Sequence, residues 1–339
     1  MLKQISLLIL CAVAIVLFAT PVHACTSAVV SGKVTLDGRP LLWKNRDTDF
    51  MRNHVDYVKG ERYDFIAVVN SANAYLKEAW MGTNSAGFAL MNTQSYNLVD
   101  VKGDEERGAA NGRVIYRALE VCATVEDFCH FLDTISKPSD IEANFGVIDA
   151  QGGAAMFEVD YYKYVMYDAN NPKDAPYGYI ARTNFSFAGK VNEGAGYVRY
   201  MEADQVLMKA SATGNITPQF IFNDLSRSFR NRMLDIDLRS GGYNRPQASG
   251  WFIDQDFIPR SSTSCSVVVQ GVKPGVKAEL TTMWTLLGYP PTGIAVPLWV
   301  KDAGKLLPGM VRFNREHEAA LLSDWSLRLA DRVFSYKQG

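Results

Sequence analysis

Short apolar runs separated by turn residues fill most of the chain, and four longer stretches repeat their apolar residues with helical spacing. Asp37-Gly38 between the first two runs is typical of a tight hairpin, because these residues accept positive φ angles. The predicted strands are residues 25–30, 41–43, 65–69, 86–92, 145–149, 154–159, 164–167, 180–187, 266–270 and 279–286, with a turn at 81–87. The predicted helices are 112–121, one that begins at Thr124, 220–233 and 316–333.

The order of these elements predicts the fold class. Strands, a helical pair, strands, a helix, strands and a final helix follow one another without an internal repeat, a low-complexity tract or a clear linker. We therefore predict an α+β fold in which stacked antiparallel sheets lie between helical layers. Residues 25–339 are predicted to form one domain.

The first 24 residues have the layout of a secretory signal. Lys3 supplies a positive start, residues 5–18 are almost wholly apolar, and Val22-His23-Ala24 resembles a cleavage site. The apolar part is shorter than the roughly 20 residues of a membrane-spanning helix. We therefore expect cleavage after Ala24, a mature protein without a membrane span, and a periplasmic or secreted location.

Lipidation at Cys25 is the alternative to plain cleavage. Bacterial lipoproteins also begin their mature chain with cysteine, and their modification acylates the α-amine. His23 stands where their recognition sequence normally has a small or apolar residue, which favours plain cleavage. A non-catalytic lipoprotein, which binds a ligand or partner, remains the alternative from another functional class.

Composition excludes several functional classes. A hydrophobic content of 47 % excludes a disordered chain. The 35 basic and 36 acidic side chains contain no basic run, so we expect no nucleic-acid partner. The five cysteines include no CxxC pair, and no HExxH motif occurs, so we expect no metal and no cofactor. Disulfides among Cys122, Cys129 and Cys265 are left open.

Cleavage after Ala24 would give Cys25 a thiol and a free α-amine on the same Cα. The amine has an unperturbed pKa of roughly 7.7 to 8.0 and the thiol of roughly 8.5, so the amine can accept the thiol proton near neutral pH. The expected reaction is acyl transfer, in which the thiolate attacks an amide carbonyl and water releases the acyl-enzyme. Such a site also needs an orienting carboxylate, oxyanion donors and a cation.

Four residues are candidates for these supporting roles. Asp47 follows a hairpin that can return it to Cys25. Asn92 and Asn184 carry neutral amides that suit an oxyanion, and Arg199 can supply the cation.

The same positions carry a resemblance to a known family. Cys25-Thr26 and then Asn45-Arg46-Asp47 resemble the opening of the choloylglycine hydrolases and of the related penicillin acyltransferase-type enzymes. Further along, residues 82–92, 183–185 and 197–199 resemble the two asparagine elements and the downstream arginine of that family. The resemblance implies an N-terminal nucleophile (Ntn) hydrolase with a four-layer αββα sandwich of two antiparallel sheets flanked by helices. The catalytic residues that it implies are Cys25, Asp47, Asn92, Asn184 and Arg199.

One position departs from the choloylglycine hydrolase pattern. Those enzymes usually carry arginine three residues before the aspartate, where this chain has Lys44. Lysine lacks the planar fork of arginine, so bile-salt or penicillin specificity is not carried over.

The sequence therefore predicts an exported cysteine amidohydrolase that cleaves a linear, non-peptide amide of a small molecule. Transfer of the acyl group to an amine acceptor is the alternative reaction. The substrate could be an N-acyl amino acid, a bile-salt conjugate or a penicillin-like compound, and a homo-oligomer is left open.

Overall fold

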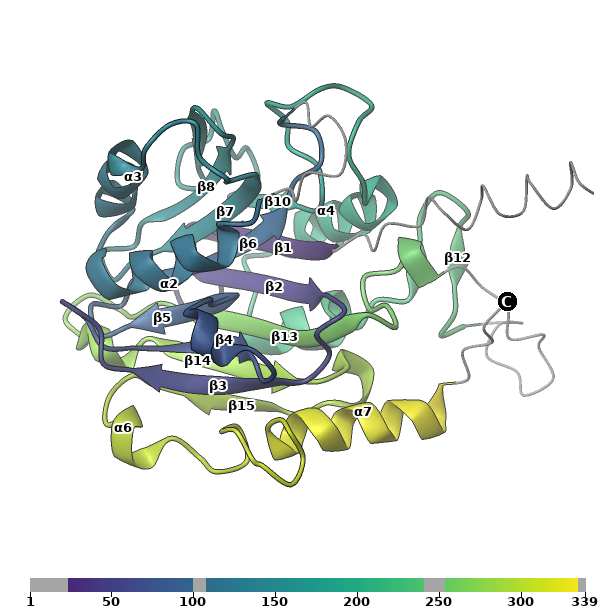
Figure 1. Cartoon of the computed structure of the whole chain (residues 1–339). Coiled ribbons are helices and arrows are strands. Elements are labelled where there is room, and N and C mark those ends of the chain that lie inside the picture. Colours follow the sequence, from purple (N-terminus) through teal and green to yellow (C-terminus); the bar gives the residue numbers. More distant parts are fainter. Residues whose placement is uncertain (1–23, 100–107, 241–253, 335–339) are drawn as a thin grey trace, which may run out of the picture.

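The computed structural model describes residues 24–99, 108–240 and 254–334. The predicted signal segment lies outside these residues except for Ala24. Within them, two large antiparallel sheets lie face to face (Figure 1). The first sheet has the order β10 (Tyr179–Arg182), β1 (Cys25–Val30), β2 (Leu41–Asp47), β13 (Thr263–Gln270), β14 (Thr282–Leu287) and β15 (Ala295–Leu298). The second sheet is a meander of β3 (Asn53–Val58), β4 (Phe65–Asn70), β5 (Met81–Asn84), β6 (Ala89–Gln94), β7 (Ala143–Ile148), β8 (Ala154–Val159) and β9 (Tyr164–Asp168).

Helices cover the outer faces of both sheets. Apolar side chains of α2 and α3 pack on the second sheet, and those of α4, α5 and the π-turn at Ile221–Leu225 pack on the first. The α-helices among the described residues are α2 (Asn111–Val121), α3 (Val125–Thr134), α4 (Tyr197–Ser211), α5 (Pro218–Phe220), α6 (Ala303–Leu306) and α7 (Leu321–Val333). This arrangement confirms the predicted four-layer αββα sandwich. None of these helices has the length and apolar composition needed to cross a bilayer.

Residues from distant parts of the chain form the first sheet. The predicted hairpin is confirmed, because β1 and β2 pair antiparallel and Gly38 takes a positive φ of 79° in their connection. On its other side β2 pairs with β13, so that Arg46 lies between Cys25 and Cys265. The first residue of β1 is thus held inside a sheet.

The two sheets approach closely near the middle of the inter-sheet core. Val29 and Leu42 of the first sheet pack there against Met91 of the second. Gly146 makes this possible, because a Cβ at its position would lie 2.2 Å from the Met91 Cε and 2.8 Å from the Leu42 Cδ1. Burial of each such large apolar side chain stabilises the fold by about 1.5 to 3 kcal/mol.

Local sequence signals are borne out at α3. The Thr124 Oγ1 accepts a hydrogen bond from the Asp127 N–H at 3.0 Å, and the Asp127 Oδ2 accepts one from the Thr124 N–H at 3.1 Å. This reciprocal capping box satisfies two N–H groups that the first helical turn leaves without partners.

Other local predictions were wrong. Residues 81–84 form β5 rather than a turn, and neither β3 nor α4 was predicted. The helix predicted at 220–233 ends at Leu225, and Arg230 already belongs to a short hairpin of β11 (Arg230–Asn231) with β12 (Ile236–Asp237). The strand predicted at 180–187 ends at Arg182, which leaves Asn184 in a loop.

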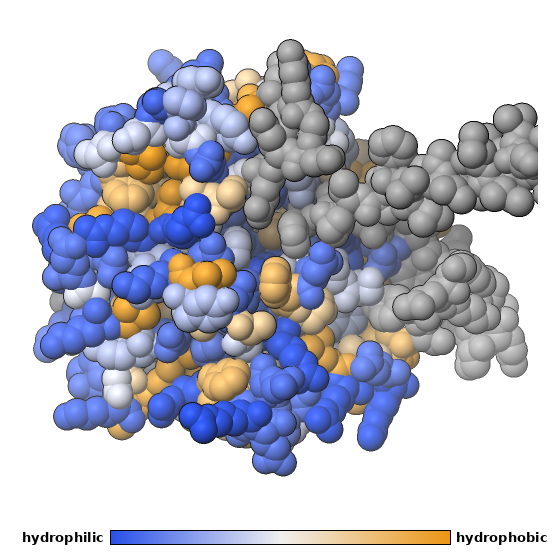
Figure 2. All heavy atoms as spheres, in the orientation of Figure 1, coloured by the Kyte–Doolittle hydropathy of each residue, from blue (hydrophilic) through white to orange (hydrophobic). Residues whose placement is uncertain are grey.

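The C-terminal helix begins later than predicted, at Leu321. Two residues of its apolar stripe are largely exposed, Trp325 at 56 % and Val333 at 62 %. The small residues Ser326 and Ala330 are buried instead. Figure 2 shows that hydrophobic and hydrophilic residues are mixed over the face drawn there, so this face shows no single broad apolar area.

Candidate active site

The main-chain atoms of Cys25 are held by side chains that are distant in sequence. The Cys25 N–H donates a hydrogen bond to the Asn184 Oδ1 at 3.0 Å. The Arg199 Nη1 donates to the Cys25 carbonyl oxygen at 2.6 Å, and its Nη2 donates to the same Asn184 Oδ1 at 2.7 Å. Cys25 is only 6 % exposed. The structure therefore brings three of the predicted site residues together: Cys25, Asn184 and Arg199.

Arg199 reaches Cys25 because of the way α4 begins. Gly196 precedes the helix with a φ of 85°, a conformation that side chains rarely adopt, and a Cβ there would lie 2.5 Å from the Arg199 Nη2. The guanidinium folds back over this glycine and also donates to the Thr26 Oγ1 at 2.9 Å. Burial lowers the pKa of Arg199 to about 10, against the opposing charge of Asp47, so Arg199 remains charged at neutral pH.

Asn184 lies in a loop that the second sheet holds in place. The Asn144 Nδ2 of β7 donates to the carbonyl oxygens of Thr183 and Phe185, at 3.3 and 3.2 Å, on either side of Asn184. The Asn184 Nδ2 donates to the Gln94 carbonyl at 2.8 Å. The atom that faces the Cys25 nitrogen is thus the amide oxygen, which suits an amine better than an oxyanion.

Asp47 lies at the end of β2, beside the residue that precedes Cys25. Its N–H donates to the Ala24 carbonyl at 2.9 Å. The Asp47 Oδ1 accepts a hydrogen bond from the Thr263 Oγ1 at 2.5 Å, and its Oδ2 forms an ion pair with the Arg260 Nε at 3.3 Å. Burial raises the pKa of the Asp47 carboxyl, and Arg260 is the strongest opposing influence. Among the described residues, the Asp47 Oδ2 accepts no hydrogen bond.

Asn92 reaches the site from the second sheet and contacts Lys44 rather than Cys25. The Lys44 Nζ donates to the Asn92 Oδ1 at 2.9 Å and to the Trp80 carbonyl at 3.1 Å. Burial lowers the pKa of Lys44, and the charge of Cys25 opposes this shift. Lys44 therefore connects Asn92 to the surroundings of the thiol.

The sequence did not identify the partners of Asp47. Arg260 and Thr263 lie just before the strand predicted at 266–270, and that strand starts three residues earlier than predicted, at Thr263. A shift of register between Thr263 and Cys265 places Thr263 opposite Asp47. A polar segment before a predicted strand was the available signal, but it does not reveal which strand is its neighbour.

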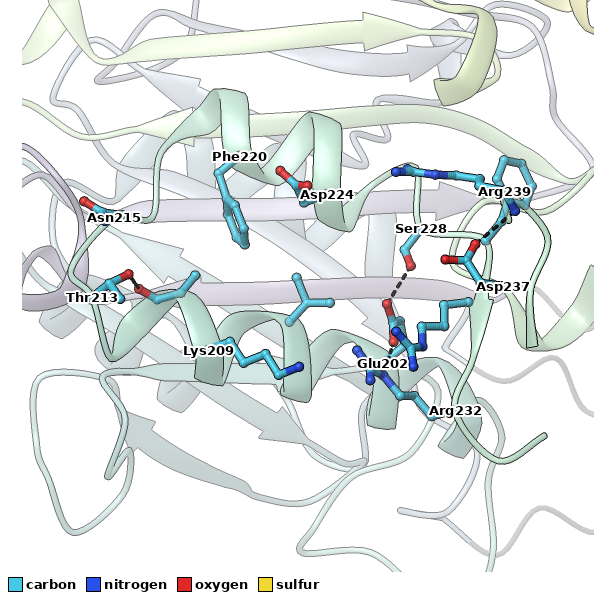
Figure 3. Close-up of a pocket in the computed structure, with 14 residues that line it drawn as sticks. Glu202, Lys209, Thr213, Asn215, Phe220, Asp224, Ser228, Arg232, Asp237 and Arg239 are labelled. Carbon is cyan, nitrogen blue, oxygen red and sulfur yellow. Dashed lines mark hydrogen bonds and ion pairs between the residues drawn. The ribbon is translucent and has the colours of Figure 1, made fainter. Parts of the chain in front are cut away.

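A separate cavity of about 430 Å³ lies beside α4 and contains none of the five predicted site residues (Figure 3). Glu202 lies at one side of it, where it accepts a hydrogen bond from the Ser228 Oγ at 2.6 Å and pairs with Arg232. The acid and the guanidinium neutralise each other, so we assign this cavity no part in the chemistry at Cys25.

A family model described as acyl-coenzyme A:6-aminopenicillanic acid acyl-transferase matches residues 35–220, more than half of the chain. The chain belongs to this acyl-transferase family. The match spans Asp47, Asn92, Asn184 and Arg199 and begins after Cys25. Membership in the acyl-transferase family confirms the predicted relationship and makes the protein an Ntn-type amidohydrolase or acyltransferase that acts on amide C–N bonds.

Solved structures similar to this member of the acyl-transferase family include three amidases. A variant of conjugated bile acid hydrolase from Clostridium perfringens has 12 % identity and a TM-score of 0.47, over 82 % of this chain and 93 % of the other. Penicillin V acylase from Agrobacterium tumefaciens has 15 % identity and a TM-score of 0.42, over 82 % and 86 %. The Caenorhabditis elegans orthologue of N-acylethanolamine-hydrolyzing acid amidase has 15 % identity and a TM-score of 0.45, over 74 % and 94 %. No curated protein matches the chain in sequence.

Proposed function

We propose that the protein is an exported cysteine amidohydrolase that cleaves a linear amide through an acyl-enzyme on Cys25. The observation that carries this proposal is the hold on the main-chain nitrogen and carbonyl oxygen of Cys25 by Asn184 and Arg199. The nitrogen of a cysteine buried in a strand for packing alone ordinarily finds its acceptor on a neighbouring strand, not on an amide side chain from a loop. A residue that uses its own α-amine as a base needs that nitrogen held in a fixed position.

In the proposed reaction the α-amine of Cys25 takes the proton of its own thiol. The sulfur attacks the substrate carbonyl carbon, and the C=O electron pair moves to oxygen. When that pair returns, the C–N bond breaks and the leaving nitrogen takes the proton from the amine. Water then attacks the thioester with the same amine as base, which releases the acid and restores the thiol.

The contacts support distinct roles for the surrounding residues. The Asn184 Oδ1 accepts from the nitrogen of Cys25. The Asp47 carboxylate, whose Oδ2 pairs with Arg260 and accepts no hydrogen bond among the described residues, would orient the amine. For Asn92, the bond from Lys44 to its Oδ1 fixes the amide and leaves the Nδ2 hydrogens for an oxyanion. Arg199 fixes the Cys25 carbonyl and is a positioning residue in this scheme.

Export and the free amine are tested together by mass spectrometry of the mature protein. We expect a chain that begins at Cys25 with an unmodified α-amine, in the periplasm or the medium. A diacylglyceryl cysteine would support the lipoprotein alternative, and a chain that keeps residues before Cys25 would remove the proposed base.

The nucleophile is tested with a panel of an N-acyl amino acid, a bile-salt conjugate and a penicillin. We expect the Cys25→Ala variant to fold and to lose turnover, and the wild type to gain the mass of one acyl group during reaction. Cys129→Ala is the matched control, because Cys129 lies on α3 and is only partly buried. Turnover by the Cys25→Ala variant would overturn the mechanism.

The same panel separates hydrolysis from acyl transfer. The family description names a transfer reaction, and an amine acceptor can replace water in the second step. We expect the free acid as the main product when an amine such as 6-aminopenicillanic acid is added. A dominant N-acylated acceptor would assign the chain to acyl transfer instead.

A further inference from the structure

Two cations lie buried beside Cys25 on the face of β2 that meets the second sheet. Lys44 is 2 % exposed and Arg46 is 3 % exposed. Arg46 lies directly opposite Cys25 in the β1–β2 pair. Because side chains alternate along a strand, Cys25 lies on the same side of the sheet as Val29, which belongs to the inter-sheet core. Both cations interact electrostatically with Cys25.

The described residues offer these two cations only neutral acceptors. Arg46 and Lys44 donate five hydrogen bonds between them, all to amide, hydroxyl or carbonyl oxygens. The acceptors are the side-chain oxygens of Thr48, Asn53, Asn70 and Asn92 and the main-chain oxygen of Trp80. Buried cations in proteins are normally paired with anions, so this set of partners is unusual.

The carboxylates that influence Arg46 are paired with other arginines. Asp47 forms its ion pair with Arg260 at 3.3 Å, and Glu78 forms one with Arg113 at 3.6 Å. No described carboxylate lies within 4.0 Å of the charged nitrogens of Lys44 or Arg46. A thiolate at Cys25 would neutralise one of the two positive charges and leave the other.

Several N–H groups of this cluster also have no acceptor. Arg46 has five N–H hydrogens and uses three, and Lys44 has three and uses two. The Trp80 ring stacks with the Arg46 guanidinium at 4.5 Å, and its buried Nε1–H has no hydrogen-bond partner among the described residues. Three N–H hydrogens of the two cations and the Trp80 Nε1–H therefore remain. Of these nitrogens, the Trp80 Nε1 is the one that is both buried and without any hydrogen bond among the described residues, although buried donors in folded proteins are nearly always satisfied.

We propose that Lys44, Arg46 and Trp80 form an anion-binding subsite that takes a carboxylate of the substrate, next to the amide that Cys25 attacks. This inference rests on the proposed function and narrows its substrate class to N-acyl amino acids, in preference to neutral N-acyl amines. A carboxylate supplies both the missing negative charge and the missing acceptors, and its two oxygens fit the in-plane N–H edge of a guanidinium. Arg46 is the main contributor, because burial lowers its pKa only to about 10 and it stays charged at neutral pH.

The test uses two substrates that differ only in charge, phenylacetylglycine and phenylacetylglycinamide. We expect the wild type to prefer the carboxylate by tenfold or more in kcat/KM, which corresponds to about 1.4 kcal/mol or more. Arg46→Gln is expected to reduce that preference about tenfold, mainly through KM of the anionic substrate. Trp80→Phe keeps a six-membered aromatic ring, loses the N–H and is expected to reduce the preference a few-fold. Trp325→Phe is the matched control on the exposed face of α7.

Binding of acetate and of acetamide to the Cys25→Ala protein provides a test that needs no turnover. We expect calorimetry to detect acetate, to miss acetamide, and to lose the acetate signal in the Cys25→Ala, Arg46→Gln double variant. Equal binding of both probes, or a substrate preference that the Arg46 and Trp80 variants leave unchanged, would overturn the subsite. The proposed function fails separately, through turnover by the Cys25→Ala protein.

Discussion

The two faces of β2, at the end that pairs with Cys25, differ in whether their charged side chains are paired with opposite charges. On the face toward the helices, Asp47 is paired with Arg260 and lies near Arg199. On the face toward the second sheet, Lys44 and Arg46 have only neutral partners. One strand thus separates a region with paired charges, which fixes the main chain of Cys25, from an electropositive region around its side chain. We infer that the first region positions the base and the second accommodates anions.

The strongest test of the paired face is Asp47→Asn, which keeps the shape of the side chain and removes its charge. We expect kcat to fall by about 100- to 10,000-fold, because the amine of Cys25 loses its orienting carboxylate. We also expect a loss of about 3 to 5 kcal/mol in the free energy of unfolding, because Arg260 would keep a buried, unpaired charge. Steady-state kinetics and urea denaturation measure the two effects.

The double variant Asp47→Asn, Arg260→Met separates structure from catalysis. Removing both charges should restore much of the stability and none of the turnover. Recovery of turnover in the double variant would mean that Asp47 serves only as the counter-ion of Arg260.

Arg199→Met tests whether the hydrogen bonds that position the main chain of Cys25 contribute to catalysis as well as to stability. This change removes hydrogen bonds to the Cys25 carbonyl, the Thr26 hydroxyl and the Asn184 amide oxygen. We expect kcat to fall about 100-fold, roughly 3 kcal/mol of transition-state stabilisation, with a smaller change in KM. Arg199→Lys keeps the charge without the fork and should recover stability more than kcat. Equal recovery of both would show that the charge alone is sufficient.

The sequence predicted the parts of this site that rest on local patterns. The Asp37-Gly38 turn gave the hairpin that places Asp47 beside the start of β1, and spaced asparagine and arginine elements gave Asn184 and Arg199. Each of these signals is either a pattern of a few neighbouring residues or a short motif that resembles one in the family and occurs in the same order along the chain.

The parts that were missed depend on pairing between distant segments. Thr263 lies 216 residues after Asp47, and no local pattern indicates that β13 is the neighbour of β2. The sequence also did not show which face of α7 is buried, since periodicity identifies an apolar face but not the surface it meets. The electropositive face of β2 was also missed, because alternation along the strand becomes informative only when the partners on the second sheet are known.

The two thiols on the electropositive face should differ in reactivity. Burial raises the pKa of Cys265 to about 11, against the opposing influence of Arg46, so Cys265 stays protonated at neutral pH. We expect Cys265→Ala to keep kcat within about threefold, the scale of about 0.6 kcal/mol. Iodoacetamide followed by peptide mapping should label Cys25 well before Cys265, with buried Cys122 as a further slow control. Equal labelling of Cys25 and Cys265 would contradict the proposal that the position of Cys25 makes its thiol the more reactive of the two.

A further expected effect is a pH-dependent difference in stability between the wild type and Lys44→Met. Burial lowers the pKa of Lys44 in the folded protein below its usual value of 10.5, so between the two values the unfolded chain binds more protons at this residue than the folded one. The wild type therefore gains stability from Lys44 as the pH rises through that window. Lys44→Met lacks this titration, so it should be more stable than the wild type at pH 7, and its advantage should disappear as the pH approaches 10.5. Lost hydrogen bonds of Lys44 offset part of this advantage, so the expected net difference is small, and urea denaturation across this pH range measures it. A difference that does not change with pH would mean that burial does not lower the pKa of Lys44 in the folded protein. The contrast between the two faces of β2 would then rest on Arg46 alone.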